Sequence, residues 1–182
     1  MHSFLRVGGA AALTLVLTWP QAAGAGQLVW QYTHDEESAF LGVVDADNAK
    51  QDEPDYPFSM QCSVDGDETT VVSDVDAKAL GKSISNGEVP SFHYVIDGKP
   101  DADAGGEVAD IRFNQLSDVW QYIVNGADTD LLTDASTIRI DGTGVGLDLP
   151  QDKMQTLLKQ FKDACDTLES SSEDGEEDDS GQ

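Results

Sequence analysis

The fold is decided by residues 150–168, which read PQDKMQTLLKQFKDACDTL. The apolar side chains of this stretch recur every three or four residues and so share one stripe of an α-helix: Met154, Leu157, Leu158, Phe161, Ala164, Cys165 and Leu168. Pro150 can begin a helix at little cost, because the first turn leaves its N–H groups unpaired. We therefore predict a C-terminal helix that closes over a sheet with this stripe inward.

Cys165 lies on the apolar stripe, and the other cysteine, Cys62, lies far upstream in a stretch that alternates like a strand. Two cysteines in an exported chain are most simply a disulfide. The pairing would close a loop of roughly 100 residues, which the chain-entropy treatment values at about 4 to 5 kcal/mol. A redox pair is a poorer interpretation because the cysteines are not in a C-x-x-C motif, and two lone cysteines do not make a zinc site.

Export is indicated by the first 25 residues, which have the parts of a signal peptide. Arg6 supplies the positive start, residues 7–19 are apolar, and Ala23-Gly24-Ala25 is a cleavage site. The apolar run is shorter than the roughly 20 residues of a spanning helix, and no other stretch is apolar enough to span a membrane. An uncleaved anchor is the alternative. We expect a periplasmic or secreted protein.

The remaining chain divides into two parts. Residues 26–168 have the length of a single domain. Residues 169–182 contain 7 acidic and no basic residues among serine and glycine, so we predict a disordered acidic tail.

The charge of the chain limits its partners. There are 35 acidic and 10 basic residues, for a net charge of −25. Such a chain repels nucleic acid and anionic membranes, so we expect neither as a partner. One interpretation is an acidic surface that keeps a protein soluble in a saline environment. The other is a surface dedicated to cations or to a basic ligand.

Strands are predicted wherever apolar residues alternate, over residues 27–33, 38–45, 58–64, 69–75, 89–96, 107–113, 136–140 and 145–149. Residues 65–68 and 141–144 have the composition of hairpin turns. Residues 114–126 change to a helical period with Leu116, Val119, Trp120 and Ile123 on one stripe, and Asn125-Gly126 as a stop signal. The expected fold class is α+β: a mainly antiparallel β-sheet of about seven or eight strands, a middle helix and a C-terminal closing helix.

No stretch has the pattern of a catalytic or metal site. The best approach to an EF-hand loop begins at Asp101 and Asp103, but position 5 is Gly105 and position 12 is Arg112. We therefore expect no EF-hand, and Asp101 and Asp103 stay as weak candidates for a calcium site in a loop.

Enzymatic signatures are also missing from the sequence. There is no G-x-S-x-G motif, and His34 and His93 are too far apart for a zinc pattern. The glycine-rich run at residues 142–146 lacks the lysine of a phosphate loop. We expect a protein that is not an enzyme and has no cofactor; an enzyme whose site is not visible in the sequence is an alternative.

Three lysines lie on the solvent side of the closing helix: Lys153, Lys159 and Lys162. Ordinary amphipathic patterning explains them most simply. The more specific hypothesis is that these lysines form an interaction face for a partner or for the acidic tail.

The layout of the chain resembles a known group of proteins. It has an aromatic strand at Trp30-Gln31-Tyr32, a cysteine strand at Met60-Gln61-Cys62, a strand end at Val95-Ile96-Asp97, a helix led by Phe113, and a final helix with Ala164-Cys165. This is similar to small periplasmic proteobacterial accessory proteins of the type VI secretion-associated and invasion-associated locus B kinds. The acidity and the tail depart from their pattern.

The resemblance implies an α+β, disulfide-linked accessory or interaction domain of the cell envelope. The function we expect is therefore an exported, non-enzymatic domain that binds another envelope or secreted protein. The alternative is an acidic module that binds divalent cations such as calcium.

Overall fold

The computed structural model describes residues 27–66, 68–101, 110–126 and 129–173. The predicted signal peptide, Asp103 and the end of the predicted tail lie outside these residues.

Two antiparallel sheets and three helices make up the described chain. The six-stranded sheet has the order β1-β2-β3-β4-β8-β7, built from β1 (Leu28–His34), β2 (Ser38–Asp45), β3 (Phe58–Ser63), β4 (Glu68–Val75), β8 (Val119–Asn125) and β7 (Asp110–Asn114). The four-stranded sheet has the order β10-β9-β5-β6, built from β10 (Val145–Asp148), β9 (Ile138–Gly142), β5 (Phe92–Ile96) and β6 (Lys99–Asp101). The helices are α1 (Ala77–Ser85), α2 (Thr129–Leu132) and α3 (Met154–Glu173). The predicted α+β class is confirmed.

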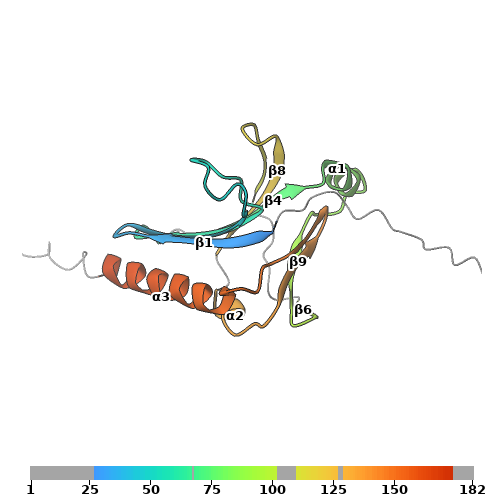
Figure 1. The fold of residues 1–182 in the computed structure, drawn as a ribbon. Helices are drawn as coiled ribbons and strands as arrows, with labels where there is room; N and C mark the ends of the chain where they lie inside the picture. The colour runs from blue at the N-terminus through green and yellow to red at the C-terminus, as the bar shows by residue number, and fades with distance from the viewer. Residues whose placement is uncertain (1–26, 67, 102–109, 127–128, 174–182) are drawn as a thin grey trace, which may run out of the picture.

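Helix α3 runs along one face of the six-stranded sheet. The four-stranded sheet lies next to the six-stranded sheet and is inclined steeply to it (Figure 1). We call this covered face the inner face. Aromatic pairs join the two sheets across the core. The rings of Phe58 and Tyr94 meet edge to face at 6.4 Å, and those of Phe92 and Tyr122 stack at 6.4 Å.

The apolar stripe of α3 is buried as the sequence predicts. Met154, Leu158 and Phe161 are at most 1% exposed. Two side chains of β1 also bind this segment: Trp30 Nε1 donates at 2.6 Å to the carbonyl of Pro150, just before the helix, and Tyr32 Oη donates at 3.2 Å to the carbonyl of Gln160 within it. The closing helix is therefore fixed to the sheet by both apolar contact and polar contact.

The ends of α3 differ from the prediction. The helix begins at Met154 rather than Pro150, because Lys153 has a left-handed φ of +59° and its carbonyl accepts the first helical bond, from Leu157. It continues to Glu173, so residues 169–173 belong to the helix and not to an extended tail.

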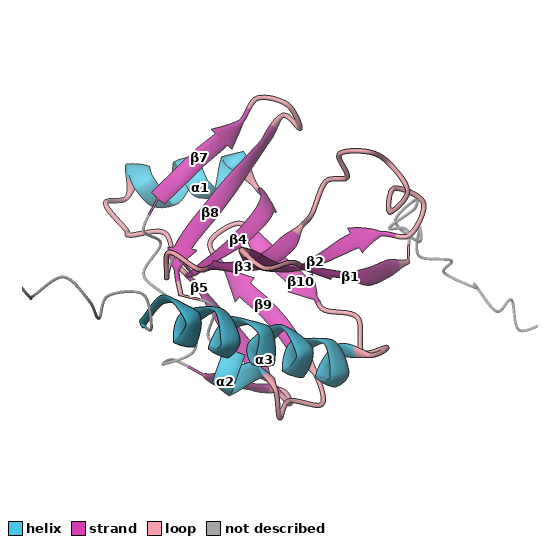
Figure 2. Cartoon of the chain, turned by 90° about the vertical axis from the view of Figure 1, so that its left-hand side faces the viewer, coloured by secondary structure: helices cyan, strands magenta, loops and turns pink. Residues whose placement is uncertain are grey.

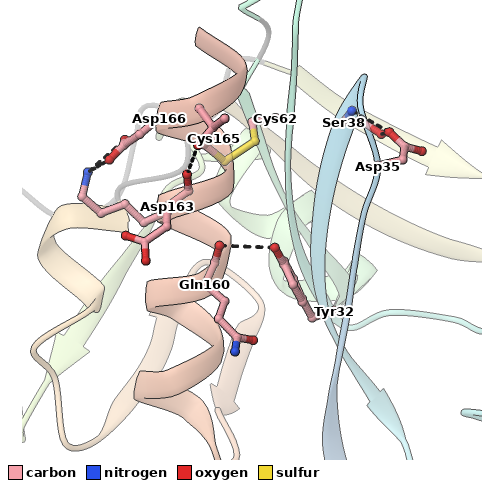
Figure 3. The surroundings of a disulfide bond; sticks show 10 residues. Tyr32, Asp35, Ser38, Cys62, Gln160, Asp163, Cys165 and Asp166 are labelled. Atoms are coloured by element: carbon pink, nitrogen blue, oxygen red, sulfur yellow. Dashed lines mark hydrogen bonds and ion pairs between the residues drawn. A yellow bond between two sulfur atoms is a disulfide. The ribbon is translucent and has the colours of Figure 1, made fainter. Parts of the chain in front are cut away.

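The disulfide joins α3 to β3. Cys62 and Cys165 are bonded, with 5.8 Å between their Cα atoms and 103 residues between them in sequence. Figure 3 shows the bond passing from the middle of the helix to the strand. The predicted pairing is confirmed.

Residues 46–57 fold back over the outer face of the six-stranded sheet, and we call them the strap. Tyr56 Oη donates to Gln31 Oε1 at 2.6 Å, and Gln31 Nε2 donates to the carbonyl of Ala49 at 2.7 Å. The Tyr56 ring lies directly over Gly42, where an added Cβ would be 2.5 Å from its Cδ1 atom. Because Gly42 has no side chain, the strap can pack closely against β2 at this position.

The turn between β9 and β10 connects the two sheets. Its Gly144 carbonyl accepts from the N–H of Asp76, at the end of β4, at 2.8 Å. Its Thr143 carbonyl accepts from Tyr122 Oη of β8, and the Thr143 N–H donates to Ser91 at 2.9 Å. Gly144 has φ +73°, a conformation that favours glycine.

The predicted helix at residues 114–126 is wrong, because these residues form the turn after β7 and strand β8. Tyr122 and Val124 alternate toward the core while Leu116, counted in the helical stripe, is 92% exposed in the turn. Buried side chains alternate along β8, and β8 pairs with β4. These two features determine the structure here, although the apolar residues also have a helical spacing.

The helix in the middle of the chain is α1 instead, at residues that gave no clear pattern. The Asp76 carboxylate caps it by accepting from the N–H groups of Lys78 and Ala79, both at 2.8 Å. Strand β6 lies at the edge of the four-stranded sheet, where Pro100 is tolerated because an edge strand pairs on one side only. The single predicted sheet is in fact two.

The packing of Tyr56 on Gly42 predicts opposite effects of two glycine substitutions. Gly42→Ala should lower the free energy of unfolding by about 1 to 3 kcal/mol, because the new methyl group overpacks the site. Gly81→Ala, in α1 with nothing within 4 Å of the added Cβ, should raise it by about 0.5 to 1 kcal/mol. Urea denaturation measures both. In a Tyr56→Ala background the cost of Gly42→Ala should shrink; an unchanged cost contradicts the contact.

The disulfide should supply a large part of the stability. Replacing both Cys62 and Cys165 by alanine should lower the free energy of unfolding by about 4 to 5 kcal/mol, because the denatured chain loses a long closed loop. Urea denaturation with and without a reductant measures the difference, and the reductant should not affect the double variant. Two free thiols in the unreduced, denatured protein would refute the bond.

Candidate functional site

A groove of about 940 Å³ opens beside the disulfide. The ends of β3, β4 and β8 form one side, and α2 with α3 forms the other. Among the described residues, the charged side chains that line it are Glu68, Asp130, Asp166, Glu169 and Lys162. We call it the acidic groove, because four of these five side chains are carboxylates.

Lys162 shows how this groove holds a cation. Its Nζ lies 3.0 Å from Asp130 Oδ1 on α2 and 3.1 Å from Asp166 Oδ2 on α3. The hydrogen bonds that the Lys162 ammonium donates to Asp130 and Asp166 raise its pKa above the ordinary value. Two carboxylates from separate helices therefore converge on one ammonium.

The two carboxylates stay accessible to solvent while they hold Lys162. The side chains of Asp130 and Asp166 are 82% and 58% exposed. Ion pairs this exposed contribute little to folding, since water screens them and the side chains lose entropy. Both carboxylates can therefore be reached from solvent.

The three lysines expected to form an interaction face have different surroundings. Lys159 pairs with Asp163 at 3.0 Å, one helical turn later, and Lys162 pairs across the acidic groove. Lys153 precedes α3 and is exposed. The role of these lysines as an interaction face stays a prediction, but two of them have carboxylate partners within the chain.

The candidate calcium site at Asp101 and Asp103 stays a prediction. Asp101 ends β6, and its side chain and Asp103 lie outside the described residues. Within the described residues no three His, Cys, Asp or Glu side chains form a group that could hold a metal ion. His34 stacks on Tyr32 with 5.7 Å between the rings, and His93 lies in β5.

Of the charged residues of the groove, sequence reasoning singled out only Lys162; it missed Glu68, Asp130, Asp166 and Glu169 as site residues. Asp130 lies in a helix of only four residues and Glu68 begins β4. Nothing in their local sequence distinguishes them among 35 acidic residues. Only the docking of α3 brings them beside Lys162 and Asp166.

The described chain is therefore a two-sheet α+β domain with one long-range disulfide and an acidic groove beside it. Comparison with known protein families, with curated proteins and with solved structures found no match to this chain. In the described part of the chain, no helix has both the length and the apolar character needed to cross a membrane.

Removal of Lys162 should destabilise the protein slightly and in a pH-dependent way. Its pKa is raised in the folded state, so its ion pairs stabilise the fold below the ordinary value of 10.5 and are lost as pH rises through the raised value. Lys162→Met should therefore lower the melting temperature at pH 7, and the difference from the native protein should shrink in strongly alkaline buffer.

Lys159→Met is the matched control, because Lys159 is 70% exposed and pairs only within one helix turn. Its effect on the melting temperature should be smaller. An equal effect of the two substitutions at pH 7 would contradict the bridging role of Lys162.

Proposed function

We propose that this chain is an exported, non-enzymatic binding protein whose acidic groove takes a cationic segment of another protein. The observation that carries the proposal is the Lys162 ammonium, held between Asp130 and Asp166 from two different helices. A lysine of a partner can take the same two contacts. An arginine can do so with two parallel hydrogen bonds to one carboxylate.

The remaining carboxylates of the groove extend this cation site. Glu68 enters from the sheet side and Glu169 from the next turn of α3, so the groove has negative charge along its length. A segment with several spaced basic residues fits this distribution better than a single small cation does. The net charge of −25 would also attract a basic partner from a distance and raise its association rate.

The proposal of export has two supports. A disulfide persists in oxidising compartments such as the periplasm or the extracellular space. The parts of a signal peptide at residues 1–25 agree with this location. A partner in the cell envelope is the further expectation that follows from the resemblance to accessory proteins.

A short peptide of alternating lysine and alanine tests the groove directly. Titration calorimetry should show binding that weakens steeply between about 50 and 500 mM salt, because salt screens the attraction. Asp130→Asn with Asp166→Asn should weaken binding about tenfold or more at low salt, since each carboxylate is a charged acceptor. Lys162→Met should strengthen it, because the internal ammonium no longer competes.

The control removes the same charge elsewhere. Asp47→Asn with Asp52→Asn changes two exposed acids of the strap and should weaken binding only slightly. Equal losses in the two double variants would show a general charge effect and overturn the groove. Displacement of the peptide by about 1 mM calcium would favour the cation-binding module.

A further inference from the structure

The outer face of the six-stranded sheet carries a second, smaller pocket that is separate from the acidic groove. Its volume is about 250 Å³, and it lies between the strap and the β7–β8 hairpin. Figure 2 shows the β2–β3 connection and this hairpin rising on either side of the sheet. The floor comes from β3, β4 and β8, on the face opposite α3.

The walls of this outer pocket are fixed before any ligand arrives. The strap is tied to β1 through Tyr56 and Gln31, and the carbonyl of Pro57 accepts from the N–H of Ser73 at 2.9 Å. The opposite wall is the hairpin turn, where the Asn114 side chain accepts from the N–H of Leu116 at 3.0 Å. Binding in a preformed pocket loses less conformational entropy than binding in one that must be ordered.

A β-bulge places a carboxylate at the edge of this pocket. The pairing of β4 with β8 shifts register between Val72 and Val75, and Asp74 within the shift has a left-handed φ of +59°. Aspartate tolerates this conformation better than most residues. Bulges redirect side chains at the places where sheets bind ligands, and here Asp74 joins the lining of the pocket.

The chemistry of the lining selects the ligand. Hydroxyl and amide groups predominate among its polar side chains: Ser59, Ser73, Asn114, Ser117 and Gln121. Asp55 and Asp74 add carboxylates, and no described lysine, arginine or histidine lines the pocket, so an anionic ligand is disfavoured. Val71 and Val119 of the floor and the Tyr56 ring provide apolar surface.

Gln121 and Ser73 already form a hydrogen bond inside this pocket. Gln121 Nε2 donates to Ser73 Oγ at 3.0 Å, and Ser73 is 7% exposed. The bond fixes the orientation of the amide, so its carbonyl oxygen can accept from a ligand. The pocket thus offers oriented neutral donors and acceptors above an apolar floor.

We propose that the outer pocket binds a small neutral polyol, such as a single sugar ring. Ring hydroxyls would donate to Asp74 and to the Gln121 carbonyl, and the C–H face of the ring would pack on Val71 and Val119. The volume is below the range of about 300 to 1,000 Å³ that is common for drug-sized ligands, which suits one ring. This proposal does not rest on the acidic groove.

Nuclear magnetic resonance of the purified protein tests it. The probes are glucose, galactose, mannose and N-acetylglucosamine, each titrated to about 20 mM, because so small a ligand should have a dissociation constant near 1 mM. At least one sugar should give saturable shifts at the amides of Val71, Ser73 and Gln121. Asp74→Asn keeps a residue that tolerates the bulge and should weaken binding about tenfold.

Gln61→Ala is the control, because Gln61 lies on β3 outside the pocket, and the affinity should not change. If Asp74→Asn fails to fold, Gln121→Ala provides the same comparison. Absence of saturable shifts with all four sugars overturns the proposal. So do shifts that appear with butylammonium but not with any sugar, because they show that charge rather than hydroxyl groups is recognised.

Discussion

The docking of α3 on the inner face of the six-stranded sheet is the constraint on which the rest of the structure depends. Its apolar stripe fills the core, Tyr32 binds its backbone, Trp30 binds the carbonyl of Pro150 just before it, and the Cys62–Cys165 bond fixes it to β3. A chain with net charge −25 repels itself when it becomes compact. A helix with both apolar and covalent attachment is a direct way to oppose that repulsion.

The same docking assembles the acidic groove. Asp130 on α2 and Asp166 on α3 are far apart in sequence, and only the packed helices place both beside Lys162. Lys159 and Lys162 each bind an aspartate one turn later, so α3 neutralises part of its own charge. Glu68 and Glu169 also line this groove. The helix that stabilises the fold therefore also forms one wall of the groove.

Much of this fold could be predicted from the sequence, because periodicity and cysteine count report local structure directly. Strands β1 to β4, the buried stripe of α3 and the disulfide all follow from such patterns. The strand at Val119–Asn125 was missed because Val119, Trp120 and Ile123 fit a helical stripe as well as a strand. The division into two sheets depends on the turn at Thr143 and Gly144, and the acidic groove depends on tertiary docking. Neither leaves a local pattern.

The sheet topology has a consequence for the order in which the protein can fold. Strands β1, β2 and β3 are synthesised well before α3, which covers them from the other end of the described chain. Their apolar face has no cover until that helix arrives, and Cys62 has no thiol to pair with. Contacts between such distant segments slow folding and prolong exposure of apolar strands. The dense negative charge would then reduce aggregation of the nascent protein, since incomplete chains repel one another until α3 covers the sheet.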